Sequence, residues 1–378
     1  MTATRQPADG LYVGLISGTS ADGIDAALCR FGPQPQLLGA LTHPWPDALR
    51  SRMLAIAQSE EPVDLDAFGR LDSAIGDCFA DAVQALLAAH DRTADDIRAI
   101  GSHGQTLRHR PDGEHAFTLQ LGNPWLMAER CGIDTVADFR RADMAAGGQG
   151  APLMSAFHAA VLAAPGRTRG VLNLGGIGNL TVLGADGSVR GFDTGPANGL
   201  MDAWCQRHTG QPFDSDGVFA AQGKCDDALL AQWLSDPYFA LPPPKSTGRE
   251  YFHLEWLESH PRAAAPAPAD VQATLLALTV RSVADAVHAH AGTASDILVC
   301  GGGVHNRALM DALAQALAPR EVHSTAMMGV DPDYMEAMGF AWLARQHLEG
   351  LPGNLPSVTG ARGKRLLGSL HRAPRPFA

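Results

Sequence analysis

The chain has 378 residues, of which 46% are hydrophobic and 18% are charged, and its formal net charge is −11. These values predict a globular protein with room for two domains, and the negative charge argues against a general binder of nucleic acid or of anionic membranes. The six cysteines form no C-x-x-C pair, and no apolar stretch is long enough to span a membrane. We therefore expect a cytoplasmic protein with reduced thiols and a disordered tail at residues 1–10.

A turn rich in Gly, Ser, Thr and Asp joins two apolar runs near the start of the chain, at residues 11–16 and 24–31. This pattern predicts a β-hairpin whose backbone amides could bind phosphate oxygens, because glycine lets the backbone approach a ligand. An ordinary hairpin turn is the alternative, and the turn is neither a Walker P-loop nor a Rossmann fingerprint. Residues 171–183 repeat the pattern around a second glycine-rich turn. The two copies predict a duplicated architecture, with two phosphate-binding hairpins facing each other across a cleft.

The segment between the two hairpins contains several predicted elements: strands at 40–46, 97–102 and 117–121, an amphipathic helix from Leu65 to Leu86, and helices at 124–131 and 153–163. Residues 102–106, Ser-His-Gly-Gln-Thr, follow directly after a predicted strand. Polar residues at this place are typical of ligand sites in α/β proteins, although a loop with one surface histidine stays open. Asp138, Arg140 and Asp143 are expected to form a structural ion pair. The glycine-rich stretch at 146–152 is the first candidate for a crossing between domains.

In the second half, a short strand is expected to deliver Asp193 to a turn beside the start of a helix at 196–204. A carboxylate there is well placed to act as a base or to order a metal-bound water, whereas the structural alternative is a helix N-cap. Further on, a strand at 297–300 runs into glycines 301–303, which would let an adenine or a ribose lie against the backbone. Asn306 is expected to cap the helix that follows.

The remaining elements are predicted helices at 225–234, 274–291, 307–317 and 334–348. Asp331, Pro332 and Asp333 are expected to cap the last of them. Glu336 lies in its first turn, so the carboxylate is structural by default and contacts a ligand only if that turn faces the cleft.

The chain resembles the anhydro-N-acetylmuramic acid kinase family in its motifs and in their order. The motifs are segments 17–25, 102–106, 173–179, 193–198 and 301–306, with further agreement at 243–250 and 336–338. The resemblance covers residues 11 to about 360. It implies a two-domain α/β fold, the actin-like ATPase (ribonuclease H-like) fold, with an active-site cleft between its lobes. The N-terminal lobe would comprise 11–141, with 360–378 a candidate for returning to it, and the C-terminal lobe would comprise 142–359.

The resemblance also implies the reaction: ATP and water convert 1,6-anhydro-N-acetylmuramic acid into N-acetylmuramic acid 6-phosphate and ADP, in cytoplasmic cell-wall recycling by a homodimer. Mg²⁺ would bridge the phosphates through water, with no dedicated protein cage. Ala197 stands where the family usually has glycine. By motif, the implied site residues are Gly18, Thr19, Ser20, Ala21, Asp22, Gly23, Ile24, Asp25, Gly175, Gly176, Gly178 and Asn179 for the ATP phosphates, Gly301, Gly302, Gly303 and Asn306 for adenosine, Asp193 as general base, and His103, Gln105 and Glu336 for the sugar.

Three other functions are considered. A kinase for another small sugar or acid would show the same sequence chemistry, so that only the resemblance separates the two. A non-catalytic actin-like or chaperone-like nucleotide switch would need a long peptide-binding or polymerising insertion, which the sequence does not show. A metalloprotease-like relative of the same fold would need a close histidine pair, and no His-Glu-x-x-His occurs.

Overall fold

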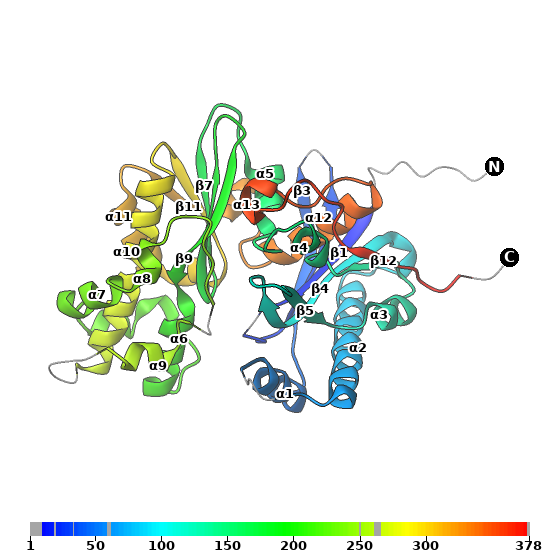
Figure 1. Cartoon of the computed structure of the whole chain (residues 1–378), viewed down its shortest axis with the longest axis horizontal. Helices are drawn as coiled ribbons and strands as arrows, with labels where there is room; N and C mark the ends of the chain where they lie inside the picture. Colours follow the sequence, from blue (N-terminus) through cyan, green and yellow to red (C-terminus); the bar gives the residue numbers. More distant parts are fainter. Residues whose placement is uncertain are drawn as a thin grey trace. The chain divides into compact units, whose positions relative to one another are not determined.

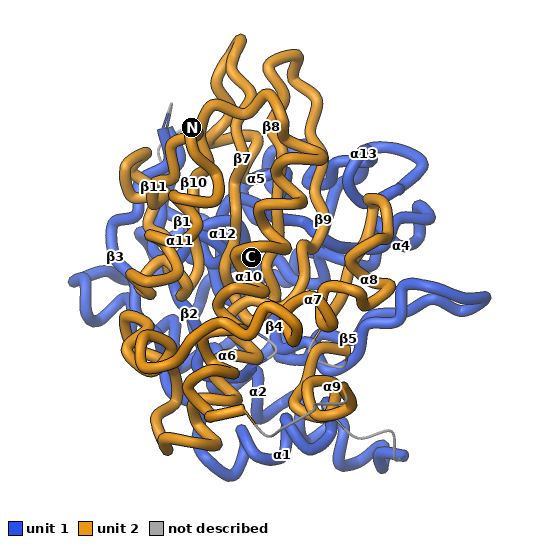
Figure 2. Tube along the Cα trace, turned by 90° about the vertical axis from the view of Figure 1, so that its left-hand side faces the viewer, with its two compact units in different colours: residues 1–157, 334–378 blue, residues 158–333 orange. Residues whose placement is uncertain are grey.

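The computed structural model describes residues 10–18, 20–32, 34–58, 62–248, 251–260 and 266–375. The chain divides into two compact units, Met1–Phe157 with Tyr334–Ala378 (unit 1) and His158–Asp333 (unit 2), which are coloured separately in Figure 2. The tail expected at 1–10 lies outside the described residues except for Gly10, and so does Thr19.

Unit 1 is built on a seven-stranded sheet with the order β12-β6-β4-β1-β2-β3, in which β5 also pairs with β4. β1, β2 and β3 form an antiparallel meander, whereas β4 runs parallel to β1 and β6 runs parallel to β4. The strands are β1 Leu11–Ser17, β2 Ile24–Phe31, β3 Pro35–His43, β4 Ile97–Arg110, β5 Phe117–Leu121, β6 Thr135–Ala137 and β12 Ser369–His371. The predicted first hairpin is therefore confirmed.

Helices cover this sheet (Figure 1). They are α1 Asp47–Gln58, α2 Leu65–Ala89, α3 Pro124–Cys131, α4 Arg141–Ala145, α12 Met335–Leu348 and α13 Pro356–Thr359, with a short 3₁₀ turn η2 at Ala94–Asp96; the division between the units falls within α5 Met154–Leu162. The apolar stripe of α2 is buried as its spacing predicts, with Leu71, Ile75 and Phe79 in the core. α1 was not expected from the sequence.

α12 lies unusually close to the sheet of unit 1, where it packs on β1, β4 and β2. Two strand glycines allow this approach. A Cβ atom at Gly14 would overlap the carbonyl oxygen of Ala337, and one at Gly101 would overlap that of Phe340. The sheet therefore accepts the helix backbone only because these two positions have no side chain.

Unit 2 repeats this strand arrangement in a five-stranded sheet with the order β11-β10-β7-β8-β9. β7, β8 and β9 form an antiparallel meander, and β10 and β11 continue the sheet in parallel from β7. The strands are β7 Arg169–Leu174, β8 Ile177–Leu183, β9 Val189–Pro196, β10 Asp296–Cys300 and β11 Glu321–Ser324. This is the order and direction of β6-β4-β1-β2-β3 in unit 1, so the expected α/β class and its duplicated architecture are confirmed.

The helices of unit 2 pack around a core that contains Trp233, Leu275 and Leu278. They are α6 Asn198–Thr209, α7 Asp227–Leu234, α8 Pro237–Ala240, α9 Leu254–Glu258, α10 Pro268–His290 and α11 Arg307–Leu317, with 3₁₀ turns η3 Ser215–Gly217, η4 Ala220–Gln222, η5 Gly302–His305 and η6 Thr325–Met328. None of the described helices, in either unit, is both long and apolar enough to cross a membrane.

Several boundaries differ from those expected. β3 runs from Pro35 to His43 rather than over 40–46. Segment 102–106 lies inside β4, not after it, because β5 pairs with β4 from Gln105 onward. Asp193 lies inside β9, because β8 pairs with β9 as far as Pro196.

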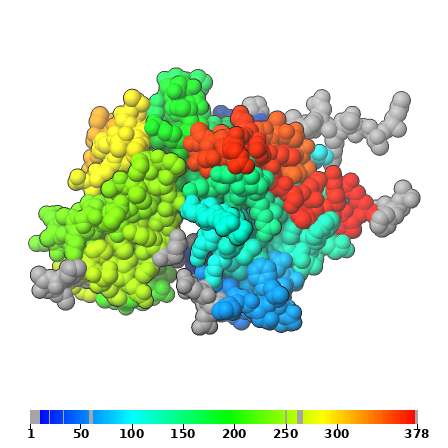
Figure 3. Space-filling model, in the orientation of Figure 1, coloured from blue at the N-terminus to red at the C-terminus, as the bar shows by residue number. Residues whose placement is uncertain are grey.

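The division into units also differs from the expected lobe boundaries. Residues 334–359 belong to unit 1, because α12 packs on the sheet of that unit. Residues 142–157 also belong to unit 1, where α4 packs on β5. The chain thus leaves unit 1 within α5 instead of at 146–152. The C-terminal segment, red in Figure 3, lies on the surface of unit 1. There β12 pairs with β6, and Arg372 and Arg375 form ion pairs with Asp134.

Two expected roles for aspartates are wrong. Asp331 and Asp333 do not cap α12, whose N-cap is Tyr334 without a side-chain hydrogen bond. The expected ion pair among Asp138, Arg140 and Asp143 is not present either. Asp138 pairs with Arg141 at 3.5 Å, while the buried Asp143 accepts hydrogen bonds from the Gly150 amide, Asn354 and Thr359.

Candidate active site

The β1–β2 turn, predicted to bind phosphate, is held by an arginine of α1. The Ala21 amide donates to the Gly18 carbonyl at 3.0 Å, and Ala21 has a positive φ of 49°. Arg50 Nε donates to the Ala21 carbonyl at 2.7 Å, and Arg50 Nη2 lies 3.1 Å from Asp22 Oδ1. At Gly18 an added Cβ would meet only Ser20 Oγ at 3.8 Å, so the fold itself leaves space there.

Asp25 and Glu336 bring two carboxylates into one region of unit 1. Thr42 Oγ1 donates to Asp25 Oδ1 at 2.7 Å and lies 3.5 Å from the Tyr334 hydroxyl, two residues before Glu336. Burial raises the pKa of Glu336 and the charge of Asp25 adds to this, while Arg140 opposes it. The first turn of α12 is therefore coupled electrostatically to the end of the first hairpin.

His103 and Gln105 lie on β4 and are buried. His103 Nε2 accepts from Arg140 Nε at 3.0 Å, and its Nδ1 lies 3.0 Å from the Gly104 carbonyl. This pattern assigns the ring proton to Nδ1, and burial together with Arg140 lowers the pKa of His103, so the imidazole is neutral. Gln105 Nε2 donates to the Gly18 carbonyl at 3.1 Å and so links this region to the β1–β2 turn.

Arg140 is a residue that the sequence interpretation treated as structural only. It contacts His103 directly and interacts electrostatically with Glu336, so it connects two of the three residues expected at the sugar. Neither hydrophobic periodicity nor a turn motif in the sequence indicates this role for Arg140. The residue lies in a short polar connection after β6, and its hydrogen bond to His103 joins residues 37 positions apart.

In unit 2 the β7–β8 turn is packed against the start of α6. The Gly175 carbonyl accepts from the Asn198 amide at 3.0 Å, and the Gly176 carbonyl accepts from the Ala197 amide at 3.1 Å. Gly175 has open space, with the nearest atom to an added Cβ at 3.7 Å. Gly178 is tighter, because an added Cβ would lie 2.6 Å from Thr194 Oγ1. The open glycine is thus the one with room for a ligand.

Asp193 has both carboxylate oxygens oriented by neighbours. Oδ1 accepts from Asn179 Nδ2 at 2.7 Å, and Oδ2 accepts from the Thr247 amide at 3.0 Å. Its backbone amide donates to the Lys245 carbonyl, and its carbonyl accepts from the Tyr238 hydroxyl at 2.8 Å. The N-cap alternative is excluded, because the N-cap of α6 is Ala197.

The loop after α8 supplies much of this support. Lys245 Nζ donates to the Tyr238 carbonyl at 3.2 Å and lies 4.6 Å from the centre of the Tyr238 ring. Burial lowers the pKa of Lys245, and the charge of Asp193 opposes that shift. The sequence contained a signal here, since the proline-led segment 243–250 agrees with the family pattern, but it did not indicate a contact with Asp193.

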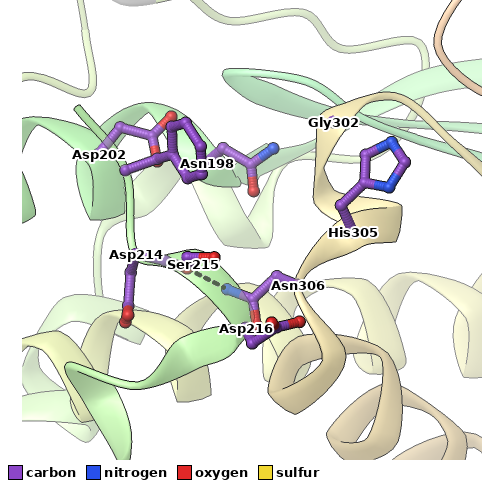
Figure 4. Close-up of a pocket in the computed structure, with 9 residues that line it drawn as sticks. Asn198, Asp202, Asp214, Ser215, Asp216, Gly302, His305 and Asn306 are labelled. Atoms are coloured by element: carbon purple, nitrogen blue, oxygen red, sulfur yellow. Dashed lines mark hydrogen bonds between the residues drawn. The ribbon is translucent and has the colours of Figure 1, made fainter. Parts of the chain in front are cut away.

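A pocket of about 360 Å³ lies in unit 2 (Figure 4), a volume within the range of roughly 300–1,000 Å³ typical of small-molecule sites. It is lined by Asn198, Asp202, Phe213, Asp214, Ser215, Asp216, Gly302, His305 and Asn306. Gly302 and Asn306 were expected at adenosine, and the buried Gly303 lies beside them in η5. Segment 213–216 was missed, because no sequence pattern distinguishes it from an ordinary loop.

The pocket wall has defined polar contacts. Asn306 Oδ1 accepts from the Leu309 amide at 3.1 Å, which confirms the predicted cap, and Asn306 Nδ2 donates to the Asp214 carbonyl at 3.4 Å. His305 Nε2 lies 2.8 Å from an oxygen of Asp333. Gly301 has a φ of 80°, and a Cβ there would overlap Asn173 Oδ1. Throughout the described part of the chain, no group of three or more His, Cys, Asp or Glu side chains is arranged to hold a metal ion.

Comparisons with known proteins agree with one family. Residues 10–373 match the family described as anhydro-N-acetylmuramic acid kinase. Proteins with that name are 56% identical in Xanthomonas campestris pv. campestris (strain 8004), over 99% of this chain and 100% of that protein, and 52% identical in Bordetella petrii, over 96% of each. A solved ROK family glucokinase from Streptomyces griseus, in complex with glucose and AMPPNP, aligns over 89% of this chain and 100% of its own, with 15% identity and a TM-score of 0.43. A structural similarity of that size does not bear on the substrate, but the family match spans nearly every residue. The chain therefore belongs to the anhydro-N-acetylmuramic acid kinase family.

Proposed function

We propose that the chain uses ATP and water to convert 1,6-anhydro-N-acetylmuramic acid into N-acetylmuramic acid 6-phosphate and ADP. The observation that carries this proposal is the family membership. It rests on the match over residues 10–373 and on 56% identity over 99% of this chain and 100% of the relative from Xanthomonas campestris. No observation favours a kinase for an ordinary hydroxylated sugar or a non-catalytic nucleotide switch. Cell-wall recycling in the cytoplasm and a homodimeric state remain predictions.

The chemistry of the substrate indicates what Asp193 has to do. A 1,6-anhydro sugar has no free 6-hydroxyl group, so a base cannot activate O6 by removing its proton. Asp193 instead takes a proton from a water molecule, whose oxygen bonds to C1. The C1–O6 bond breaks, O6 bonds to the γ-phosphorus of ATP, and ADP leaves. One carboxylate thereby serves both ring opening and phosphoryl transfer.

The geometry around Asp193 supports this role. Asn179 and the Thr247 amide each donate one hydrogen bond to a different carboxylate oxygen. These contacts fix the orientation of the carboxylate, whose oxygens are the atoms that would accept the proton. A base that is already oriented needs little reorganisation before it reacts.

The phosphates of ATP are assigned to the two glycine turns and the adenosine to the unit 2 pocket. Gly18 and Gly175 both leave open space beside the backbone, and the pocket volume of about 360 Å³ suits a nucleoside. Mg²⁺ supplies charge neutralisation to the phosphates when it is bound, and the carboxylates of Asp22 and Asp25 are oxygen donors that could hold it through water. His103, Gln105 and Glu336 are assigned to the sugar.

A labelling experiment tests the proposed reaction. The protein is incubated in ¹⁸O water with Mg-ATP and either the anhydro sugar, N-acetylmuramic acid or N-acetylglucosamine, and the products are weighed after rapid quenching. We expect ADP and a sugar 6-phosphate from the anhydro sugar alone, with one ¹⁸O at C1 and none in the phosphate ester. Unlabelled product placed in ¹⁸O water measures the exchange at C1 without enzyme. Phosphorylation of the hydroxylated sugars with no turnover of the anhydro sugar would refute the proposal.

Substituting valine for Gly18 or Gly175 is expected to weaken ATP binding about tenfold or more, because the new side chain occupies the space assigned to a phosphate. Neither glycine has a positive φ or a close neighbour, so both variants are expected to fold. Calorimetric titration with ATP measures the effect. Gly32→Val is the matched control, since Gly32 has similar open space in the β2–β3 turn, with Gln34 O at 3.9 Å. Unchanged affinity in both folded variants would contradict the phosphate assignment.

A further inference from the structure

Arg140 carries a positive charge for which the described residues supply no ion-pair partner. Its Nε donates to His103 Nε2 at 3.0 Å, and its Nη1 donates to the Gly150 carbonyl at 2.8 Å. The neighbouring Arg141, in contrast, pairs with Asp138 at 3.5 Å. Burial lowers the pKa of Arg140 to about 10, against the influence of Glu336, so the guanidinium is still charged at neutral pH.

Glu336 attracts this charge electrostatically but forms no close ion pair with it. A partly buried cation in this position is costly, because it has lost part of its hydration without gaining a hydrogen-bonded carboxylate. His103 does not share this charge, since burial and Arg140 hold its pKa low and the ring is neutral. The arrangement therefore fits an anion that is supplied from outside the chain. A guanidinium suits a carboxylate or phosphate because its planar donors match two oxygens at once.

A second observation points to a ligand in the same region. Gln105, two residues along β4 from His103, is 2% exposed. Its Nε2 donates to the Gly18 carbonyl, but its buried Oε1 has no hydrogen-bond partner among the described residues. A buried acceptor in this state is rare in native proteins, and a ligand that carries a hydroxyl or an amide would satisfy it.

The identity of the anion follows from the substrate, and this step rests on the proposed function. N-acetylmuramic acid differs from N-acetylglucosamine by a lactyl ether that ends in a carboxylate. We propose that Arg140 binds this lactyl carboxylate and selects the acidic anhydro sugar over neutral ones. Glu336 is a carboxylate and would repel the lactyl group, so it is assigned to sugar hydroxyl or amide groups. Arg140 is thus a specificity-determining residue that contacts substrate.

The test compares the acid with its uncharged counterpart. kcat/KM is measured for 1,6-anhydro-N-acetylmuramic acid, for its lactamide, in which the carboxylate is a neutral amide, and for 1,6-anhydro-N-acetylglucosamine. Wild type is expected to prefer the acid by on the order of 10²-fold, the scale of a desolvated charge-assisted contact. In Arg140→Gln this preference is expected to disappear through a loss on the acid alone, with the KM for ATP unchanged. Arg140→Lys keeps a point charge without the planar donors, so its preference for the acid is expected to lie between that of wild type and that of Arg140→Gln.

Arg141→Gln is the matched control, because it removes the adjacent arginine. Its kcat/KM for each sugar and its KM for ATP are expected to equal those of wild type. Equal losses on acid and lactamide in Arg140→Gln would mean that Arg140 only supports the fold, and a raised KM for ATP would assign it to phosphate. Both results would overturn the inference. A wild-type ratio of kcat/KM near one between the acid and its lactamide would overturn it as well, and that measurement does not depend on the folding of any variant. In these cases wild type still turns over the anhydro sugar, whereas the absence of any turnover would overturn the proposed function and the inference with it.

Discussion

The Asp193→Asn variant is expected to turn over about 10²–10⁴-fold more slowly than wild type, with ATP and sugar affinities close to normal. Asparagine keeps the shape of the side chain and one oxygen that can accept from the Thr247 amide, and Asn179 can rotate its amide to face the new NH₂ group. It cannot accept a proton from water. Single-turnover measurement of sugar phosphate, combined with calorimetry of both ligands, separates chemistry from binding.

Asp22→Asn and Asp25→Asn are the controls for this prediction. Both carboxylates are assigned to phosphates and metal, so their loss is expected to appear mainly in nucleotide affinity. If Asp193→Asn retained most of its kcat, the base assignment would be wrong. Glu336 would then be tested next, because burial raises the pKa of this carboxyl, a shift that is typical of proton-transferring groups.

Gly14→Ala and Gly101→Ala are each expected to destabilise unit 1 by about 3 kcal/mol or more. The added methyl group would overlap the carbonyl oxygen of Ala337 or Phe340, and a helix backbone cannot turn aside as a flexible side chain can. α12 would have to move away from β1 and β4, which would also displace Glu336. Denaturant unfolding and the yield of folded protein measure the effect.

Gly69→Ala is the matched control for the two strand glycines. Gly69 lies within α2, and an added Cβ would have no atom within 4 Å. Alanine is therefore expected to leave stability unchanged or to raise it by up to about 1 kcal/mol, because glycine is the poorer helix former. Wild-type stability in Gly14→Ala would show that α12 does not pack as closely as the structure has it.

Local patterns in the sequence were sufficient for much of the fold. The two glycine hairpins, the apolar stripe of α2 and the Asn306 cap depend on residues close together in the chain, and all are present. The duplicated topology followed from finding the same hairpin twice. Turn chemistry and periodicity act over a few residues, so they can be recognised without knowing what packs against them.

Strand ends and unit boundaries depended on pairing and packing instead. β4 continues beyond residue 102 because β5 pairs with it. In the same way, β9 continues past Asp193 because β8 pairs with β9. Residues 334–359 belong to unit 1 because α12 finds its glycine-lined place on that sheet. No local signal reports whether a neighbouring strand or helix will extend an element.

The sequence by itself determined the family, the glycine turns and the identity of Asp193 as the candidate base. Only the tertiary structure decided what surrounds these residues. Arg50 reaches the first turn across 29 residues, and Thr247 reaches Asp193 across 54. Arg140 meets His103 across 37 residues and has no ion pair among the described residues. Such contacts arise where separate elements pack. The charge without a close ion pair, and with it the proposed binding of the lactyl carboxylate, therefore becomes visible only in the folded chain.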